Sequence, residues 1–466
     1  MRRRAILPLL MALLFAATSA HAAQVKFGNA SIHDPSVLYA DGTYYIYGSH
    51  MQAARSADLQ DWKLFSKLDK CTLQPEYATQ FKEALSFAET GTFWAPDVIQ
   101  LADGRYYMYY CCCEGSKPLA AIGLAVSDSP EGPFENVRIL LKSGEPGYDA
   151  TKLPNAIDPC VFFDADERLW MVYGSYSGGI FLLELDPATG LILEGQEPYG
   201  IHLLDGNHSC IEAPYMVYNA GTGYYYLFLS FGGLGVNDGY NMRVCRSRNV
   251  EGPYEDASGH DMRDCACQPG NFWNNDDIAP YGVKLMGGYQ FTPLAGENSE
   301  KAQAIRSPGH NSVYHDEAAN RWFLIHHTRF ASTGDRYIVQ TRRMWFNDYG
   351  WPVVAPTRFV ADEHIPPDIV FNPVGSWKLL RHEQDVNSVE HTSVEAAFSA
   401  EGAVSGGLAG EYAIDGDRIT LRLDGVTYRG VCAMGYDSDQ DAFVSTFTAM
   451  SEDGQTLWGV RATGQD

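Results

Sequence analysis

One pattern of polar, apolar and aromatic positions occurs five times along the chain. Each copy has a polar or acidic residue beside Pro or Asn, an apolar stretch, a tight turn and then an aromatic-rich strand. Turns such as Asp-Gly and Gly-Thr-Gly tolerate positive φ, so two strands can reverse within a few residues. Each copy therefore predicts a hairpin. The copies begin at His33 (HDPSVLYADGTYYIYGS), Trp94 (WAPDVIQLADGRYYMYYCC), Ile157 (IDPCVFFDADERLWMVYGS), Ile211 (IEAPYMVYNAGTGYYYLFLS) and Gly309 (GHNSVYHDEAANRWFLIHH).

The spacing of the copies predicts a closed array of repeats. Successive copies start about 60 residues apart, and the last interval is longer because it holds an insertion. Units of this size cannot bury both faces alone, but they close stably as blades around an axis. We therefore expect an all-β fold with a five-bladed β-propeller over residues 23–364. A β-sandwich or an open β-solenoid is the alternative.

A second domain follows a Pro-rich segment. Residues 365–375 (IPPDIVFNPVG) predict a linker. Residues 376–466 contain alternating strands with Asp-Gly and Asp-Ser turns, as in EYAIDGDRITLRL, and predict a small C-terminal β-barrel. The barrel has no acid pair that suggests chemistry, so its role stays open.

The N-terminus predicts export. Residues 1–22 combine Arg2–Arg4, a short apolar run and the small-residue pattern Ala-His-Ala, which is typical of a secretory signal peptide. No later segment reaches the roughly 20 apolar residues that span a bilayer. We expect a mature chain that is secreted to the periplasm or the medium, and without a lipobox cysteine we expect no lipid anchor.

Charge and cysteine usage narrow the partners. The formal net charge is −24, from 34 basic and 58 acidic side chains, which disfavours nucleic acid, anionic membranes and polyuronic acid. A neutral substrate and a monomeric chain are the expectation. The ten cysteines show no framework spacing, and the Cys265/Cys267 pair lacks a second ligand pair at a zinc-finger distance.

Three acids occupy equivalent positions in the repeats. Asp34, Asp158 and Glu212 each open an inner strand, and Asp97 stands in a shifted register. A single such acid is usually a turn cap, but in a propeller these three converge on the axis. Crowded carboxylates have divergent pKa values, so one can stay protonated while another stays ionised. Hydrolysis of a glycosidic bond requires that combination.

Other candidates surround these acids. His310 opens the fifth copy and could bind a metal or a carboxylate. Trp94, Tyr176, Phe231 and Trp273 are candidates for stacking on sugars, with core packing as the alternative for each. The chain has no GxSxG, GxxxxGK[ST] or HExxH motif, so other common chemistries lack support.

The ordered motifs HDPSV, FWAPDV, IDP, GSYSGGIF, HSCIEAPY and GHNSV resemble glycoside hydrolase family 43. Within that family they are similar to extracellular endo-α-1,5-L-arabinanases with a C-terminal β-barrel. The likeness extends from about Val25 to the C-terminus. It implies endo-hydrolysis of arabinan by an inverting mechanism.

The resemblance also implies roles for individual residues. Asp34 matches the general base, Glu212 the general acid and Asp158 the carboxylate that raises the pKa of the acid. His310 matches a histidine that holds a calcium ion, whose other ligands are mostly water. The expected substrate contacts are Trp94, Ser175 and Arg329.

The chain departs from the family pattern at its cysteines, including Cys210 two residues before the predicted acid. Two other functions stay open. An exo-acting arabinofuranosidase or β-xylosidase could use the same carboxylates behind a walled pocket. A non-catalytic carbohydrate-binding propeller is a different class, and the intact acid set disfavours it.

Overall fold

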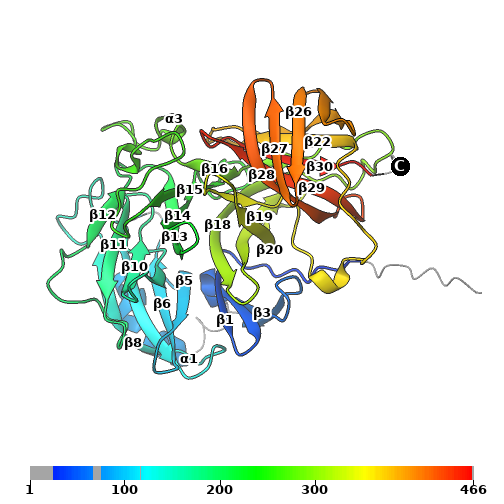
Figure 1. Ribbon diagram of the computed structural model, residues 1–466. Coiled ribbons are helices and arrows are strands. Elements are labelled where there is room, and N and C mark those ends of the chain that lie inside the picture. Colours follow the sequence, from blue (N-terminus) through cyan, green and yellow to red (C-terminus); the bar gives the residue numbers. More distant parts are fainter. Residues whose placement is uncertain (1–24, 67–74, 116, 464–466) are drawn as a thin grey trace, which may run out of the picture.

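The computed structural model describes residues 25–66, 75–115 and 117–463, and the predicted signal peptide (1–22) lies outside them. The described residues form β-strands joined by loops and a few short helices. No helix among them is long and apolar enough to cross a membrane. Figure 1 shows four-stranded sheets arranged around an axis, with a barrel beside them.

The first four blades are antiparallel sheets whose strand order follows the chain. Blade 1 contains β1 (Ser36–Ala40), β2 (Thr43–Tyr47), β3 (Ala53–Ser56) and β4 (Lys63–Ser66). Blade 2 contains β5 (Trp94–Gln100), β6 (Tyr106–Cys113), β7 (Ala120–Ser127) and β8 (Glu135–Ser143). Blade 3 contains β9 (Cys160–Phe163), β10 (Leu169–Tyr173), β11 (Ile180–Leu185) and β12 (Ile201–Leu204). Blade 4 contains β13 (Ile211–Asn219), β14 (Tyr224–Phe231), β15 (Asn241–Ser247) and β16 (Val283–Met286).

The fifth blade closes the ring. Its sheet contains β18 (Ile305–Asp316), β19 (Arg321–Phe330), β20 (Gly334–Phe346) and β21 (Pro352–Val354), extended by β17 (Tyr289–Gln290) and β23 (His391–Thr392). The innermost strands contact one another in the cyclic order β1, β5, β9, β13 and β18, with β18 next to β1 (Figure 1). The predicted five-bladed propeller is confirmed.

Strand β6 of blade 2 is buried on both faces, which explains its run of aromatic residues and cysteines. In β6, Tyr106 and Met108 pack towards blade 1, whereas Tyr107 and Tyr109 pack towards blade 3. Alternate residues of a strand face opposite sides of a sheet. The run Cys111–Cys113 follows the same rule: its two outer residues face blade 3 and its middle residue faces blade 1.

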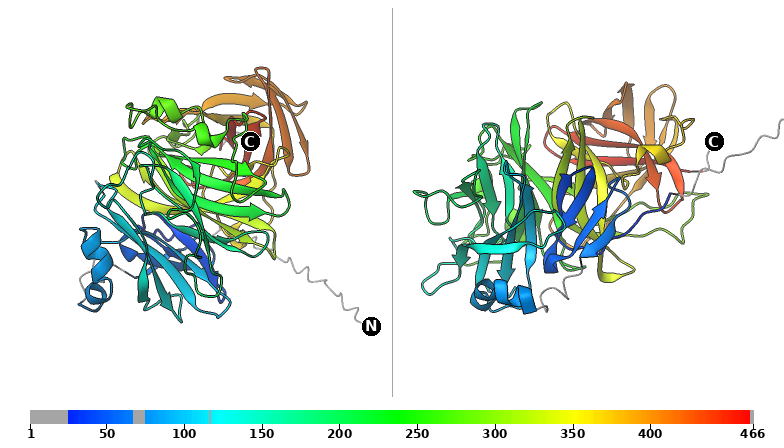
Figure 2. Two further views of the ribbon diagram at one scale, coloured as in Figure 1. Left: turned by 90° about the vertical axis from the view of Figure 1, so that its left-hand side faces the viewer. Right: turned by 90° about the horizontal axis from the view of Figure 1, so that it is seen from below.

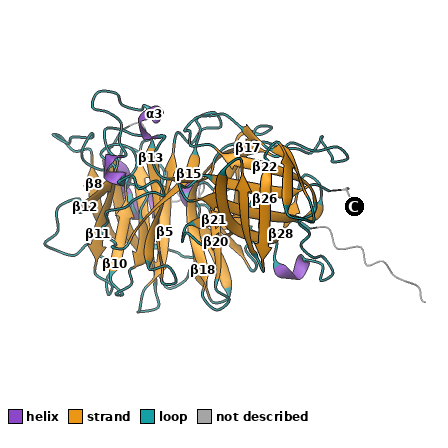
Figure 3. Cartoon of the chain, turned by 45° about the horizontal axis from the view of Figure 1, so that its top comes forward, coloured by secondary structure: helices purple, strands orange, loops and turns teal. Residues whose placement is uncertain are grey.

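The helices lie in the connections between strands, and Figure 3 shows them as minor elements. They are α1 (Pro75–Gln80), α2 (Lys82–Phe87), α3 (Asn275–Ile278) and the 3₁₀ turns Ser49–Met51, Met262–Asp264 and Asp362–His364. Between β15 and β16 the chain makes the long excursion that contains α3. This excursion accounts for part of the insertion expected before the fifth copy.

The C-terminal domain is a closed eight-stranded barrel, as predicted. Its strands are β22 (Gly375–His382), β24 (Val394–Phe398), β25 (Ala403–Gly406), β26 (Gly410–Asp415), β27 (Arg418–Leu423), β28 (Val426–Asp437), β29 (Ala442–Ser451) and β30 (Thr456–Arg461). Both views in Figure 2 place the barrel to one side of the propeller.

The two domains share a core and one sheet. Trp458 and Leu380 of the barrel join a buried cluster with Leu324 of the fifth blade. Between β22 and β24 the chain leaves the barrel, and β23 pairs in parallel with β17 of the propeller. The predicted boundary at the linker (365–375) did not anticipate that a strand beyond it would pair with the propeller.

Candidate active site

The ring of inner strands brings four predicted residues to the axis. Asp34 and Asp158 stand two residues before β1 and β9, and Glu212 is the second residue of β13. Their side chains are buried, with exposed fractions of 4%, 6% and 7% respectively. His310 enters the same cluster from β18. Residues at matching positions of the sequence repeats therefore lie close together at the propeller axis.

His310 differs from the prediction in one respect. We expected it at a strand start, but it lies inside β18, where the pairing with β19 is irregular, and its φ is 45°. Its backbone N–H donates to Ser230 Oγ (2.8 Å), and its Nδ1 lies 2.9 Å from Asp34 Oδ1. Burial lowers the pKa of His310, but the charges of Asp34 and Asp158 outweigh it and raise the pKa to about 9.

Asp34 is held as a carboxylate. His33 Nδ1 lies 2.7 Å and His310 Nδ1 lies 2.9 Å from its Oδ1, while Ser49 Oγ donates to Oδ2. Burial by itself would raise the pKa of Asp34. The charge of His310 and the hydrogen bonds from His310 and His33 outweigh that effect and hold the pKa well below its usual range. Asp34 is thus ionised and can accept a proton.

Arg329 lies behind the histidines that flank Asp34. Its Nη2 is 3.2 Å from His33 Nε2, and its Nη1 is 3.4 Å from His327 Nε2. A guanidinium can only donate, so His33 Nε2 is the acceptor and its Nδ1 carries the proton that faces Asp34. His327 Nδ1 accepts the backbone N–H of Asp34 at 3.2 Å. Arg329, which is 3% exposed, therefore contacts the two histidines that bind Asp34, His33 and His327.

The pKa of Glu212 is shifted in the opposite direction to that of Asp34. Tyr240 OH donates to its Oε1 (2.7 Å) and Ser175 Oγ donates to its Oε2 (2.9 Å). Burial is the largest effect on this carboxyl, and together with the charge of Asp34 it raises the pKa despite both hydrogen bonds and the charge of His310. Glu212 thus keeps its proton to higher pH than an exposed glutamate.

Asp158 links the site to the backbone beside Glu212. Its Oδ2 accepts the N–H of Ala213 at 3.2 Å. Burial, followed by the charges of Glu212 and Asp34, raises the pKa of Asp158 even though the charge of His310 opposes the shift. The Asp158 carboxyl therefore fixes the chain that carries Glu212 and couples to it electrostatically.

The backbone is strained where these side chains leave their strands. Asp34, Asp158 and Ala213 have φ values of 57°, 55° and 57°, in the left-handed region. Such conformations are costly for residues other than glycine and concentrate at functional sites. Gly309 leaves room for Tyr240, which donates to Glu212, because an added Cβ would lie 2.0 Å from the Tyr240 ring.

The other predicted contacts occupy different positions around the acids. Ser175 is buried beside Glu212. Trp94 is half-buried at the start of β5, and its Nε1–H donates to the carbonyl of Cys113 (2.8 Å), which fixes the orientation of the indole. Phe231 is fully buried under the guanidinium of Arg243, so it packs in the core.

Trp273 belongs to an aromatic group that leads outward from the site. Its indole is 55% exposed, and its ring centroid lies 5.6 Å from Tyr176 and 5.0 Å from His208. Tyr176 follows Ser175, and burial, with a contribution from the charge of Glu212, raises the pKa of its hydroxyl. The platform of Tyr176, His208 and Trp273 thus connects the buried acids with the surface.

Asp97 has a structural role, because its carboxylate links neighbouring blades. Ser36 Oγ donates to its Oδ1, and the N–H of Val161 donates to its Oδ2 at 2.6 Å, so it ties blade 2 to blades 1 and 3. Burial raises its pKa to about 6. The nine cysteines of the described residues, including Cys210, are buried free thiols.

Four residues at the site were not predicted: His33, Ser49, Tyr240 and His327. His33 and His327 stand beside predicted residues in HDP and HHTRF, so their neighbourhood carried a signal. Ser49 and Tyr240 reach the carboxyls from segments without a motif, and only the tertiary structure brings them there.

Two buried carboxyls in one axial cluster, with pKa values shifted in opposite directions, match the acid and base pair of a glycoside hydrolase. The sequence profile of glycosyl hydrolases family 43 matches residues 27–276, and that of a C-terminal lipocalin-like domain matches residues 368–459. The chain belongs to glycosyl hydrolases family 43.

Relatives cover nearly the whole chain. The extracellular endo-α-(1→5)-L-arabinanase 2 of Bacillus subtilis (strain 168) is 43% identical and covers 97% of each chain. The extracellular endo-α-(1→5)-L-arabinanase of Thermotoga petrophila is 40% identical, covering 94% of this chain and 95% of its own. A crystal structure of a family 43 protein from Bacillus licheniformis superimposes with a TM-score of 0.88 at 44% identity, covering 94% of this chain and 100% of that one.

Proposed function

We propose that this glycoside hydrolase cleaves internal α-1,5-L-arabinofuranosidic linkages of arabinan with inversion of configuration. The observation that carries the proposal is the opposite shift of the pKa values of two buried carboxyls, which is lowered for Asp34 and raised for Glu212. The two relatives that cover nearly the full chain, barrel included, are both named endo-arabinanases, which favours this substrate and an endo mode.

Asp34 is the general base in this mechanism. Its carboxylate takes a proton from a water molecule, whose oxygen then attacks the anomeric carbon. His33, His310 and Ser49 stabilise the ionised form by hydrogen bonds and charge. Arg329 positions His33 in the tautomer that donates to Asp34.

Glu212 is the general acid. It transfers its proton to the oxygen of the bond that breaks, so the departing chain leaves as an alcohol. Asp158 places a second carboxyl beside Glu212, so ionisation of both groups together is costly and the pair tends to retain a proton; Asp158 also anchors the following backbone N–H. Ser175, beside the acid, and Trp94, half-buried at the start of β5, are proposed substrate contacts.

Product analysis tests the mode of action. Linear debranched α-1,5-arabinan should give mixed oligosaccharides early, and proton NMR at the start of the reaction should show new reducing ends in the β configuration. Release of arabinose or one fixed oligomer would make the enzyme exo-acting. Binding without cleavage would return the carbohydrate-binding propeller to first place.

Trp273→Ala should weaken binding of long chains more than it slows chemistry. The indole is exposed on the platform of Tyr176, His208 and Trp273, so it can contact sugars away from the cleaved bond. We expect the KM for arabinan to rise about tenfold, equivalent to about 1.4 kcal/mol, with kcat little changed. Steady-state kinetics measure both. Phe163→Ala is the control, since Phe163 is 39% exposed at the far end of β9; an equal effect there would contradict a role for Trp273.

A calcium ion at His310 fits the residues present. The amide of Asn311 is buried with no hydrogen-bond partner on either polar atom, and it lines a small axial cavity with His310, Asp34 and Asp158. Calcium prefers oxygen ligands and accepts water among them. His310, the side-chain oxygen of Asn311 and water molecules would hold the ion, which would supply positive charge beside the carboxyls. His33, Asp34 and His327 also lie close together, but Arg329 faces both imidazoles.

Removal of calcium tests that site. Chelation should lower both the activity and the unfolding temperature, and added calcium should restore them. A ligand present at 100 times its Kd stabilises the folded state by about 2.7 kcal/mol. His310→Ala should abolish the thermal response, as measured by calorimetry. A response that survives in this variant would place the ion elsewhere.

We also infer that the mature chain acts outside the cytoplasm. The predicted signal peptide (1–22) and the extracellular designation of both relatives support this location.

A further inference from the structure

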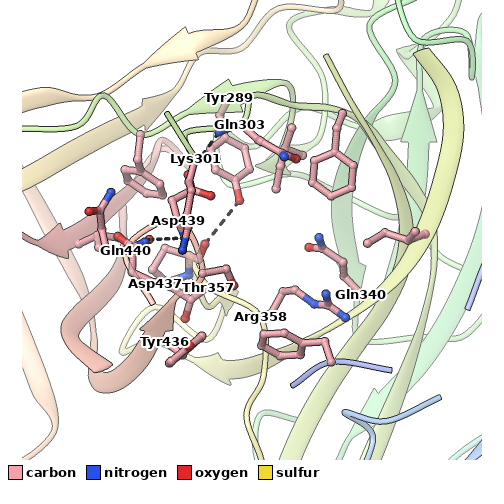
Figure 4. Close-up of a pocket in the computed structure, with 18 of the residues that line it drawn as sticks. Tyr289, Lys301, Gln303, Gln340, Thr357, Arg358, Tyr436, Asp437, Asp439 and Gln440 are labelled. Carbon is pink, nitrogen blue, oxygen red and sulfur yellow. Dashed lines mark hydrogen bonds between the residues drawn. The ribbon is translucent and has the colours of Figure 1, made fainter. Parts of the chain in front are cut away.

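A second cavity, of about 800 Å³, lies between the fifth blade and the barrel. It shares no lining residue with the axial cavity that contains the carboxyls. Its size falls within the roughly 300–1,000 Å³ of small-molecule sites. The barrel side is the turn between β28 and β29, and the propeller side is β17, β20 and the segment after β21 (Figure 4).

Aromatic rings line this cavity from both domains. They are Phe27, Tyr289, Phe291, Phe330 and Tyr436. Ligand sites combine such apolar and aromatic surface with a few polar groups that fix orientation. The C–H faces of a sugar ring would suit these aromatic surfaces.

The propeller side has guanidinium groups without acidic partners. Arg342 is 1% exposed and donates to uncharged acceptors, among them Tyr289 OH and Gln340 Oε1. Arg358 donates to Asn29 Oδ1 (3.0 Å) and lies 4.1 Å above the ring of Phe27. Across the described parts of the chain, neither forms an ion pair. This wall therefore has hydrogen-bond donors that no carboxylate neutralises.

The barrel side has the complementary groups. Asp439 accepts the N–H of Gln303 at 3.3 Å and pairs with no Lys or Arg among the residues described. Asp437 is bound to Lys378 at 2.9 Å. Figure 4 shows Asp439 and Gln440 on one side of the open space, and Gln340 and Arg358 on the other. A ligand with adjacent hydroxyls can accept from one wall and donate to the other.

We propose that this interdomain cavity is a second, non-catalytic site that binds a neutral arabino-oligosaccharide, such as a segment of the arabinan chain. The inference rests on the proposed function for the choice of sugar. Side chains of both charge signs line the cavity, with Asp439 on one side and Arg358 on the other, which suits a neutral ligand with hydroxyl groups better than an ion of one sign. The site would give the barrel a role: it forms one wall and holds substrate away from the acids.

Calorimetric titration with linear α-1,5-arabinopentaose tests the proposal in the full chain. The background is Glu212→Gln, which slows turnover strongly while keeping the shape of the side chain. Ser438→Trp, at an exposed turn position that lines the cavity, places an indole in it. Ser405→Trp is the matched control, because Ser405 is equally exposed on β25 and does not line the cavity.

We expect two equivalents of pentasaccharide in the background and in the Ser405→Trp control, and one equivalent with Ser438→Trp. One equivalent in the background and in the control, but none with Ser438→Trp, would support binding in the cavity. It would also mean that the carboxylate site binds no pentasaccharide, and so would overturn the proposed function. One equivalent in all three proteins would overturn the cavity site alone. No binding in any of them would overturn both.

Discussion

Asp34→Asn should lower kcat on linear arabinan by about 10²–10⁴-fold, the usual contribution of a general base. The amide keeps the size of the side chain but cannot take the proton of the attacking water. It also removes the charge that pairs with His33 and His310. Steady-state kinetics on arabinan measure the loss, and the far-ultraviolet circular dichroism should stay unchanged.

Asp97→Asn is the matched control for this loss. Asp97 is a buried acid of the neighbouring inner strand, but its oxygens are engaged by Ser36 and Val161. We expect a lower unfolding temperature with kcat changed only a few-fold. Near-wild-type turnover in Asp34→Asn, or equal losses in both variants, would contradict the assignment of the base.

Glu212→Gln should cause a loss of similar size on arabinan, and the loss should depend on the leaving group. The amide retains the positions facing Tyr240 and Ser175 but cannot protonate the departing oxygen. A nitrophenyl arabino-oligosaccharide has a leaving group that departs without protonation. The variant should therefore be much less impaired on that substrate than on arabinan.

Tyr240→Phe provides the comparison for Glu212. It removes a hydrogen bond to the acid and leaves the acid itself, so we expect a smaller loss. The ratio of kcat/KM values on the two substrates is the measurement. If Glu212→Gln is equally impaired on both, Glu212 is not the proton donor.

The sequence by itself determined the blade architecture. Five copies of one hairpin pattern cannot bury their faces separately, and in β6 the uninterrupted apolar run reflects burial between two neighbouring blades. The same equivalence predicted that Asp34, Asp158 and Glu212 converge, because each stands at the start of an inner strand.

Only the tertiary structure decided how each acid is tuned. The low pKa of Asp34 depends on His33 and His310, which come from opposite ends of the propeller sequence, and the hydrogen bonds of Glu212 come from Ser175 and Tyr240. Such contacts depend on side chains meeting across blades, where no local pattern records the partner.

The sequence likewise did not predict how the two domains pack against each other. The Pro-rich linker predicted a boundary, yet β23 returns to pair with β17, and Arg358 and Asp439 face one cavity from different domains. Periodicity of hydrophobic residues reports which face of a strand is buried. It does not report which distant surface covers that face, because that choice depends on the shapes of both folded domains.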